Sequence, residues 1–219
     1  VRRFPGLVSV VFNHNSRNDN VILGEEYDVL HGSDSIEEDC LGIRIRLHFK
    51  SFFQVNPEMM EVLYKTALDA ADIHPGDRVI DMYSGTGTLG LLAARQGASV
   101  TGVEIVPEAV DNARHNARLN GIDNADFRCQ DATEFAMEQQ EPVDVLIVDP
   151  PRKGLSEQGI RDIVRISPKR IVYVSCGQNT LKRDLERFAQ SGWQARWIQP
   201  VDMFCQTPNV EAVCLLEKE

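Results

Sequence analysis

The sequence of 219 residues has no long uninterrupted apolar run, and its opening residues do not follow the pattern of a secretion signal. Its longest apolar stretches, such as the one within residues 143–148, are far shorter than the roughly 20 residues that cross a bilayer. No basic segment followed by an apolar one stands at the beginning. We therefore expect a cytoplasmic protein that does not enter a membrane.

The sequence also lacks paired cysteine motifs. Its five cysteines are odd in number, scattered and without a C-x-x-C pair. That spacing is unlike a disulfide framework and unlike a zinc site. We expect reduced thiols and no metal ligands among these residues: Cys40, Cys129, Cys176, Cys205 and Cys214.

Positive charge is in deficit, because 23 Lys and Arg stand against 33 Asp and Glu, for a net charge of −10. Nucleic-acid binding depends on basic side chains that displace counterions, so this balance counts against a polyanionic partner. Between residues 41 and 50, however, Arg44, Arg46, His48 and Lys50 alternate with apolar residues, which puts the bases on one face of a strand. The favoured interpretation is a solvated strand face, and the alternative is a track for nucleic acid.

A composition of 42% hydrophobic and 26% charged residues predicts a globular protein with a full core. The chain begins with Val1, and residues 2–6 resemble the middle of a strand, so we expect a segment of a longer protein. Residues 1–56 are predicted to form a β-rich lead-in that is part of a central domain. Its expected strands are 7–12, 20–23, 27–31 and 41–49.

Residues 57–219 are predicted to form a second domain, in which strands and helices alternate. Pro57 suits the first turn of a helix with apolar residues at helical spacing, which residues 74–77 close. The later expected helices are 89–93, 109–117, 133–139, 160–166 and 181–189. The expected strands are 79–82, 99–103, 125–129, 143–148, 171–174, 195–198 and 212–216. This alternation predicts a mainly parallel, doubly wound α/β sheet with ligands beyond the carboxyl ends of its strands.

A glycine-rich turn at residues 81–90 follows the first of these strands and opens a helix, and Glu104 ends the next strand. The spacing matches the dinucleotide fingerprint G-x-G-x-x-G, in which backbone amides hold a pyrophosphate. Asp81 and a turn precede the first glycine, however, where a dinucleotide loop usually leaves the strand directly. The acids suit S-adenosylmethionine, with Glu104 at the ribose hydroxyls and Asp131 at the adenine amine. The motif favours the methyl donor over NAD only modestly.

Two further strand ends carry candidate chemistry. Asp149-Pro150-Pro151-Arg152 is a stiff loop, because the prolines fix their own φ angles and hold Asp149 extended. In amino-methyltransferases an aromatic residue takes the place of Arg152, so methylation of an exocyclic amine is disfavoured. Cys176 is placed at a helix N-terminus, which Asn179 or Thr180 can cap. There we expect the helix field to lower the pKa of its thiol.

Glu211 and residues 52–56 are weaker signals by themselves. A carboxylate at the start of the last strand can point into the same cleft as Cys176, although a solvated edge residue is the more ordinary interpretation. Phe52 offers an aromatic ring for stacking, and Gln54 and Asn56 offer amides. Core and turn positions are the alternative for that segment.

In order and spacing, these blocks resemble the RNA uracil-C5 methyltransferases, which form 5-methyluridine in rRNA or tRNA. The likeness runs through residues 52–56, 81–87, 102–104, 149–152, 174–176 and 202–211. It implies a Rossmann-like class I methyltransferase fold, S-adenosylmethionine as cofactor, and an RNA substrate, with rRNA favoured over tRNA. It also implies that Cys176 is the nucleophile and Glu211 the base.

The resemblance assigns the remaining residues to the two ligands. The implied cofactor site consists of Gln54, Tyr83, Gly85, Gly87, Thr88, Glu104, Asp131 and Asp149. The implied substrate site consists of Phe52, Asp149 and Arg152, with Phe52 stacking on the flipped base.

The chain also departs from the family. Gly177-Gln178 stand where the family has Asn-Pro, Cys205-Gln206 where it has Pro-His, and Asn209 where it has His, which affects loop geometry and substrate choice. The RNA-binding β-barrel and iron–sulfur cluster of some members have no counterpart here, so we expect no metal cluster and RNA affinity largely outside this segment. Two alternatives remain: an NAD-dependent oxidoreductase, and a non-catalytic RNA-binding fragment of the same fold.

Overall fold

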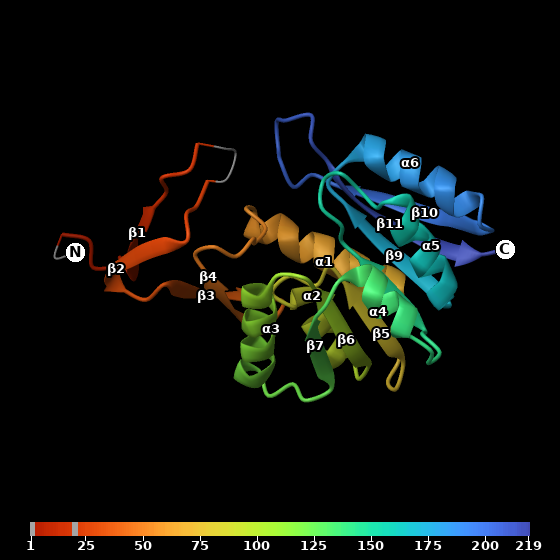
Figure 1. Ribbon diagram of the computed structural model, residues 1–219, viewed down its shortest axis with the longest axis horizontal. Coiled ribbons are helices and arrows are strands. Elements are labelled where there is room, and N and C mark those ends of the chain that lie inside the picture. The colour runs from red at the N-terminus through yellow and green to blue at the C-terminus, as the bar shows by residue number, and fades with distance from the viewer. Residues whose placement is uncertain (1–2, 19–21) are drawn as a thin grey trace.

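A seven-stranded sheet forms the centre of the protein (Figure 1). The computed structural model describes residues 3–18 and 22–219. In spatial order the strands are β10 (Trp193–Val201), β11 (Glu211–Lys218), β9 (Arg170–Ser175), β8 (Val145–Val148), β5 (Arg78–Met82), β6 (Ser99–Glu104) and β7 (Ala125–Cys129). The five strands from β9 to β7 run parallel, whereas β10 and β11 are antiparallel to their neighbours. The predicted mainly parallel, doubly wound sheet is therefore confirmed.

Helices cover both faces of this sheet, as the alternating sequence pattern predicts. They are α1 (Pro57–Ala71), α2 (Thr88–Arg95), α3 (Pro107–Leu119), α4 (Ala132–Glu138), α5 (Glu157–Ile166) and α6 (Gln178–Ala189). Buried residues of α1, α2 and α3 share one core with Ile147 and Val172 of the sheet. Those of α4, α5 and α6 share the other core with Leu146 and Ile171, the neighbours of these residues along the same strands. Each central strand is therefore buried on both sides.

Two antiparallel pairs precede α1 (Figure 1). The hairpin of β1 (Ser9–His14) and β2 (Glu26–Gly32) projects from the main body, and β3 (Ser35–Cys40) pairs with β4 (Ile43–His48). The predicted strand at 20–23 lies partly outside the described residues, and residues 22 and 23 are not in a strand. Strand β3 was not predicted, because its acidic residues were interpreted as a turn between strands.

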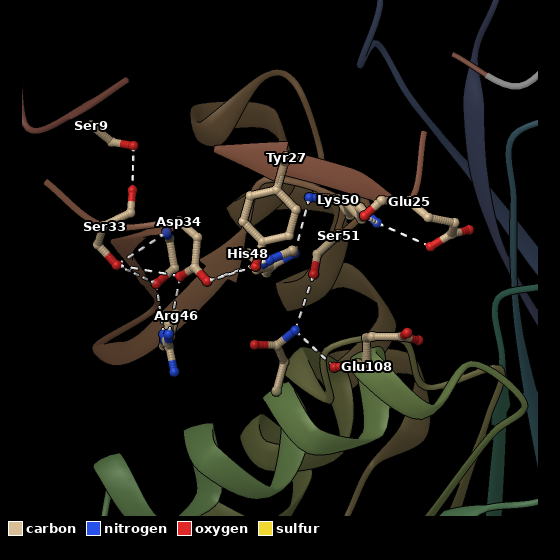
Figure 2. A network of polar contacts seen from close by, with 12 residues as sticks. Ser9, Glu25, Tyr27, Ser33, Asp34, Arg46, His48, Lys50, Ser51 and Glu108 are labelled. Carbon is tan, nitrogen blue, oxygen red and sulfur yellow. Dashed lines mark hydrogen bonds and ion pairs between the residues drawn. The ribbon is translucent and has the colours of Figure 1, made fainter. Parts of the chain in front are cut away.

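The acidic residues of this region explain the alternating bases of β4. The bases do share one face, since Ile43, Ile45 and Leu47 are buried between them. Each base has an acidic partner, and Asp34 lies between His48 and Arg46 (Figure 2). The ion pairs are Arg44–Glu37 at 3.8 Å, Arg46–Asp34 at 3.4 Å and Lys50–Glu25 at 3.2 Å. His48 Nε2 lies 3.7 Å from Asp34, and burial lowers the pKa of this imidazole, so it adds little positive charge. A neutralised face is a poor track for nucleic acid, which favours the simpler interpretation.

Asparagines on α3 fasten β4 to the main body. The backbone N–H of Arg46 donates to Asn116 Oδ1 at 2.8 Å, and Asn116 Nδ2 donates to the carbonyl of Thr86 in the glycine-rich turn at 3.2 Å. One turn later, Asn120 exchanges two hydrogen bonds with the backbone of Arg44 at 2.8 and 2.7 Å. Asn116 is fully buried whereas Asn120 is partly exposed, so only Asn116 is shielded from replacement by water.

We predict that Asn116→Ala lowers the free energy of unfolding by about 2 kcal/mol, because the buried Arg46 N–H loses its acceptor. Asn120→Ala is the matched control and should cost less than about 1 kcal/mol, since water can reach its partners. Urea unfolding of the three proteins measures both values. Equal losses in the two variants would contradict the assigned role of burial.

Candidate functional site

A cleft of about 740 Å³ lies at the carboxyl ends of β5, β6, β8 and β9. This is the edge of a parallel sheet at which ligands bind in doubly wound folds. Nearly all of the residues proposed from the sequence line it: Phe52, Gln54, Tyr83, Gly85, Thr88, Glu104, Asp131, Asp149, Arg152, Cys176 and Glu211. Their positions support a common site, and their individual roles remain predictions.

Gly87 is the exception. Its left-handed φ of 82° makes it the N-cap of α2, and a Cβ there would lie 2.7 Å from the ring of Phe127. Gly87 therefore allows the turn to pack closely on β7 and does not line the cleft. The side of Gly87 on which a Cβ would stand faces the core, and its predicted cofactor contact stays a prediction.

Glu104 holds the glycine-rich turn in place. Its Oε2 accepts from the N–H of Gly85 at 3.1 Å, and its Oε1 accepts from the N–H groups of Ile105 and Val106 at 2.8 and 2.9 Å. A carboxylate can accept about four hydrogen bonds, so Oε2 keeps capacity for a ligand hydroxyl. Gly85 has a φ of 53° and nothing within 4 Å of where a Cβ would stand, which leaves room for a ligand against the backbone.

Two other cleft residues are fixed by their local backbone. Tyr83 has a left-handed φ of 67°, and its N–H donates to the carbonyl of Val103 at 2.9 Å. A non-glycine residue in that conformation is uncommon and often marks a functional turn. Asp131 caps α4, because its Oδ1 accepts from Thr133 N at 2.8 Å and Glu134 N at 3.4 Å. These bonds leave Asp131 Oδ2 for a ligand.

The sequence suggested that the acids of this motif, Asp81 among them, suit the methyl donor, and Asp81 is the most deeply buried acid of the cleft. Its Oδ2 accepts from Gly90 N at 2.8 Å, while Asp81 Oδ1 and the hydroxyl of Ser84 have no partner in the described part of the chain. Burial raises the pKa of Asp81 to about 7, against the hydrogen bond from Gly90. Burial, followed by the charges of Glu211 and Asp81, raises the pKa of Asp149 to about 8.

This set of groups fits the methyl donor better than a dinucleotide. S-adenosylmethionine brings a sulfonium and an ammonium group, both cationic, as well as ribose hydroxyls. The buried Asp81, one oxygen of which has no partner in the described part of the chain, and the half-buried Asp149 suit cations, and the anchored Glu104 suits hydroxyls. A pyrophosphate would instead add negative charge beside Asp81 and Asp149, which disfavours the NAD interpretation.

Cys176 and Glu211 lie across from one another at the end of two adjacent strands. Strand β11 runs antiparallel to β9 with Ala212 opposite Ser175, so the next pair in this register is Glu211 and Cys176. Directly opposite residues of such a pair point to the same face of a sheet. Glu211 is only 3% exposed and Cys176 is half-buried, and both line the cleft. Glu211 is therefore not a solvated edge residue.

The expected low pKa of Cys176 is wrong. Burial, followed by the charges of Glu211 and Asp149, raises the pKa of this thiol above its usual value, although Arg152 acts in the opposite direction. The expected caps are also wrong: Gly177 is the N-cap of α6, and no side chain of the described residues caps it. The Thr180 hydroxyl donates to the carbonyls of Gly177 and Arg152 at 2.9 and 3.3 Å. Burial is thus the main cause of the raised pKa, and two nearby acids add to it.

Arg152 connects the two loops that flank the thiol. Its Nη2 donates to Asn209 Oδ1 at 2.7 Å, and Arg152 and Cys176 also line an adjoining groove of about 300 Å³. Arg152 thereby links the loop after β8 to the segment that leads into Glu211. The favourable charge of Arg152 opposes the rise in the pKa of Glu211 that burial causes.

Asp184 on α6 holds the loop that carries Arg152, and sequence reasoning missed it. Its side chain is fully buried, and its Oδ2 accepts from Leu155 N at 2.7 Å and from the Tyr173 hydroxyl at 2.8 Å. A Cβ on Gly154 would lie 2.5 Å from the same oxygen. In the sequence Asp184 looks like an ordinary helix acid, because its close approach to Gly154 arises only in the folded chain.

Within the described ranges, 3–18 and 22–219, no group of three or more His, Cys, Asp or Glu side chains is arranged to hold a metal ion. None of the helices in these ranges combines the length and apolar character that a membrane crossing needs.

Comparisons with known proteins agree with this geometry. Residues 73–187 match a family described as a methyltransferase domain. An uncharacterized RNA methyltransferase of Lactiplantibacillus plantarum is 47% identical over 98% of this chain and 48% of its own length. One from Streptococcus pyogenes serotype M3 is 44% identical over 100% of this chain and 48% of its own length. The chain thus spans about half the length of the curated relatives it matches.

A solved structure gives a similar result. The tRNA (uracil-54, C5)-methyltransferase of Pyrococcus abyssi, in complex with S-adenosyl-L-homocysteine, is 30% identical over 98% of this chain and 52% of that chain, with a TM-score of 0.79. An S-adenosylmethionine-dependent methyltransferase of Agrobacterium tumefaciens has a TM-score of 0.67 at 15% identity, which shows a shared fold alone.

We predict that Cys176 is alkylated slowly at neutral pH, because its raised pKa leaves little thiolate. Glu211→Gln should accelerate alkylation about threefold or more at pH 8, since removing the facing charge lowers the thiol pKa. Peptide mass spectrometry after iodoacetamide treatment separates Cys176 from the exposed Cys129 and Cys205. Asp202→Asn, a change at an exposed acid, is the control and should have no effect. Fast alkylation of wild-type Cys176 at pH 7 would instead indicate a low thiol pKa, as its position at a helix N-terminus predicts.

Proposed function

Because the chain belongs to the family of S-adenosylmethionine-dependent methyltransferases, we propose that it methylates C5 of uracil in RNA through a covalent Cys176 adduct. The observation that carries this proposal is the placement of Cys176 opposite Glu211 in the cleft. The RNA substrate is supported by the names of the curated relatives, and C5 of uracil by that of the P. abyssi enzyme.

A thiol and a carboxylate are the two groups that methylation at C5 needs. C5 of uracil is a poor nucleophile by itself, whereas addition of a thiolate to C6 converts it into the carbon of an enolate. Methylation of a nitrogen or of a ribose hydroxyl needs no such thiol. The pairing of Cys176 with a buried carboxylate therefore favours carbon over nitrogen or oxygen as the methyl acceptor.

The residues of the cleft divide into donor and substrate sides. S-adenosylmethionine supplies an electrophilic methyl group when it is bound. We assign its binding to Gln54, Tyr83, Gly85, Thr88, Glu104, Asp131 and Asp149, which line the cleft around the glycine-rich turn. Glu104 is assigned to the ribose hydroxyls and Asp131 to the adenine amine.

Cys176 and Glu211 each act at one carbon of the uracil ring. The thiol first gives its proton to solvent, and a bond then forms between Sγ and C6 while the ring electrons move towards C5 and O4. Once C5 carries the methyl group, Glu211 accepts the C5 proton. The electrons of that C–H bond restore the double bond, the Sγ–C6 bond breaks, and the thiolate is regenerated. Because the thiol pKa is raised, its first deprotonation should make the rate increase with pH.

The substrate base must leave its stack to reach Cys176, at a cost of a few kcal/mol that is least in single-stranded loops. Phe52 is 77% exposed and lines the cleft, so its ring is available to stack on the flipped base. Arg152 is the substrate-side cation. A loop uridine is thus the proposed target, and rRNA remains favoured over tRNA.

Replacing Cys176 by Ala should abolish both methyl transfer and any covalent protein–RNA complex, because C5 is then never activated. A denaturing gel with RNA that contains 5-fluorouridine measures the complex, since fluorine cannot leave as a proton and the wild-type adduct stays trapped. Cys205→Ala is the control: Cys205 is exposed and does not line the cleft, so this variant should keep both signals. An adduct in the Cys176→Ala variant would mean that another residue is the nucleophile.

Replacing Glu211 by Gln should slow turnover by two orders of magnitude or more while the covalent complex with ordinary RNA accumulates, because proton removal from C5 stalls. Glu217→Gln changes a carboxylate near the other end of β11, beside Arg170 and Arg196, and should behave like the wild type. The same denaturing gel, with a methyl-transfer assay beside it, compares the variants. Normal turnover by the Glu211→Gln variant would mean that Glu211 is not the base. If the wild-type protein itself showed no turnover, the non-catalytic RNA-binding alternative would be favoured.

A further inference from the structure

Three carboxylates converge in the cleft with little positive charge to balance them. Asp81 is 1% exposed, and its Oδ1 has no hydrogen-bond partner within residues 3–18 and 22–219. The Asp149 side chain is half-buried and makes no hydrogen bond or ion pair with the described residues, and Glu211 is only 3% exposed. Only Arg152 and Lys153 bring positive charge to the lining, and Arg152 already donates to Asn209.

Every element around these acids contributes ionisable groups, and almost all of them are acidic or neutral. The groups that face the cleft are Tyr64 from α1, Tyr83 after β5, Glu104 from β6, Asp131 before α4, Arg152 and Lys153 after β8, Cys176 after β9, and Glu211 from β11. An ionised carboxylate without a cation or sufficient donors is costly in such a place. The empty cleft therefore favours the neutral acids, as the raised pKa values of about 7 for Asp81 and about 8 for Asp149 indicate.

We propose that Asp81 and Asp149 hold protons in the empty cleft and release them when the sulfonium of the methyl donor binds, so that these two acids distinguish the donor from its demethylated product. The donor carries a sulfonium and an ammonium cation, whereas S-adenosylhomocysteine keeps only the ammonium. A cation beside a carboxylate stabilises the ionised form. Loss of the sulfonium on methyl transfer then returns the acids towards their protonated state, which weakens the hold on the product.

The sign of the pH dependence follows from this exchange. Below about pH 7 both acids are largely protonated before the donor binds. Donor binding must then release these protons, so a lower pH decreases the affinity for the donor. Above about pH 8 both are largely ionised already, and no proton need leave. Donor affinity should thus rise with pH by up to about tenfold per unit for each proton released, and become constant at alkaline pH.

The inference rests on the methyl-donor part of the proposed function and is independent of the uracil chemistry. Calorimetry of S-adenosylmethionine binding at pH 6.8, without RNA, in phosphate and in imidazole tests it directly, because the two buffers have different ionisation enthalpies. The heat should depend on the buffer and correspond to a release of about half a proton or more for S-adenosylmethionine. The release should be clearly smaller for S-adenosylhomocysteine.

Each remaining outcome has a distinct meaning. A buffer-independent heat for the donor, or equal proton release by donor and product, would overturn the inference while leaving the methyltransferase function intact. No donor binding at all, at any pH, would overturn the proposed function together with the inference.

Asp149→Asn and Asp81→Asn provide a second measurement that needs no ligand. An acid whose folded-state pKa is raised destabilises the protein as pH rises towards that pKa, since the unfolded chain ionises first. Each amide variant should therefore raise the Tm of the donor-free protein more at pH 8 than at pH 6, and Asp149→Asn should reduce proton release on donor binding. Asp123→Asn, at an exposed acid, is the control and should change neither quantity. If the Tm of the amide variants changed with pH in the same way as the wild-type Tm, the proposal would be contradicted.

Discussion

The antiparallel register between β9 and β11 is the constraint on which the site depends. It places Glu211 across from Cys176, although the two residues are far apart in the chain and belong to opposite strand ends. Side chains alternate between the faces of a strand, so a slip of one residue would turn one of the pair away from the cleft. The register is itself fixed by buried residues on both faces, among them Val213 and Cys214 of β11, which belong to different cores. Core packing on both sides of the sheet thus fixes the position of Glu211 relative to Cys176.

The same arrangement creates an electrostatic conflict at the thiol. Burial and the charge of Glu211 raise the pKa of Cys176, while burial also raises the pKa of Asp81 and Asp149. Arg152, whose loops are held by Asn209 and by Asp184, is the main opposing charge. A cationic ligand in the cleft would relieve this conflict. The balance of charges in the cleft is therefore as important for ligand binding as its shape.

Periodicity and chain order were sufficient to predict the α/β domain, because each amphipathic helix and buried strand leaves its own local pattern. Strand β3 was missed because Glu37, Glu38 and Asp39 suggest a turn, and only their pairing with β4 makes a strand of them. Most of the cleft residues followed from the resemblance to the RNA uracil-C5 methyltransferases, and only Glu104, Asp131 and Cys176 also from their places at strand ends. The wrong pKa direction at Cys176 and the unforeseen close packing at Gly87 have a common reason: both depend on neighbours brought close by folding, Glu211 in one case and Phe127 in the other. Asp184 was hidden for the same reason.

The claim that C5 of uracil accepts the methyl group is tested most directly by tritium release. RNA labelled with tritium at C5 of its uridines should lose one tritium to water for each methyl group transferred, because Glu211 must remove that hydrogen before Cys176 can leave. Equal amounts of released tritium and incorporated methyl would support the account. Methyl transfer without tritium release would place the methyl group elsewhere and contradict it.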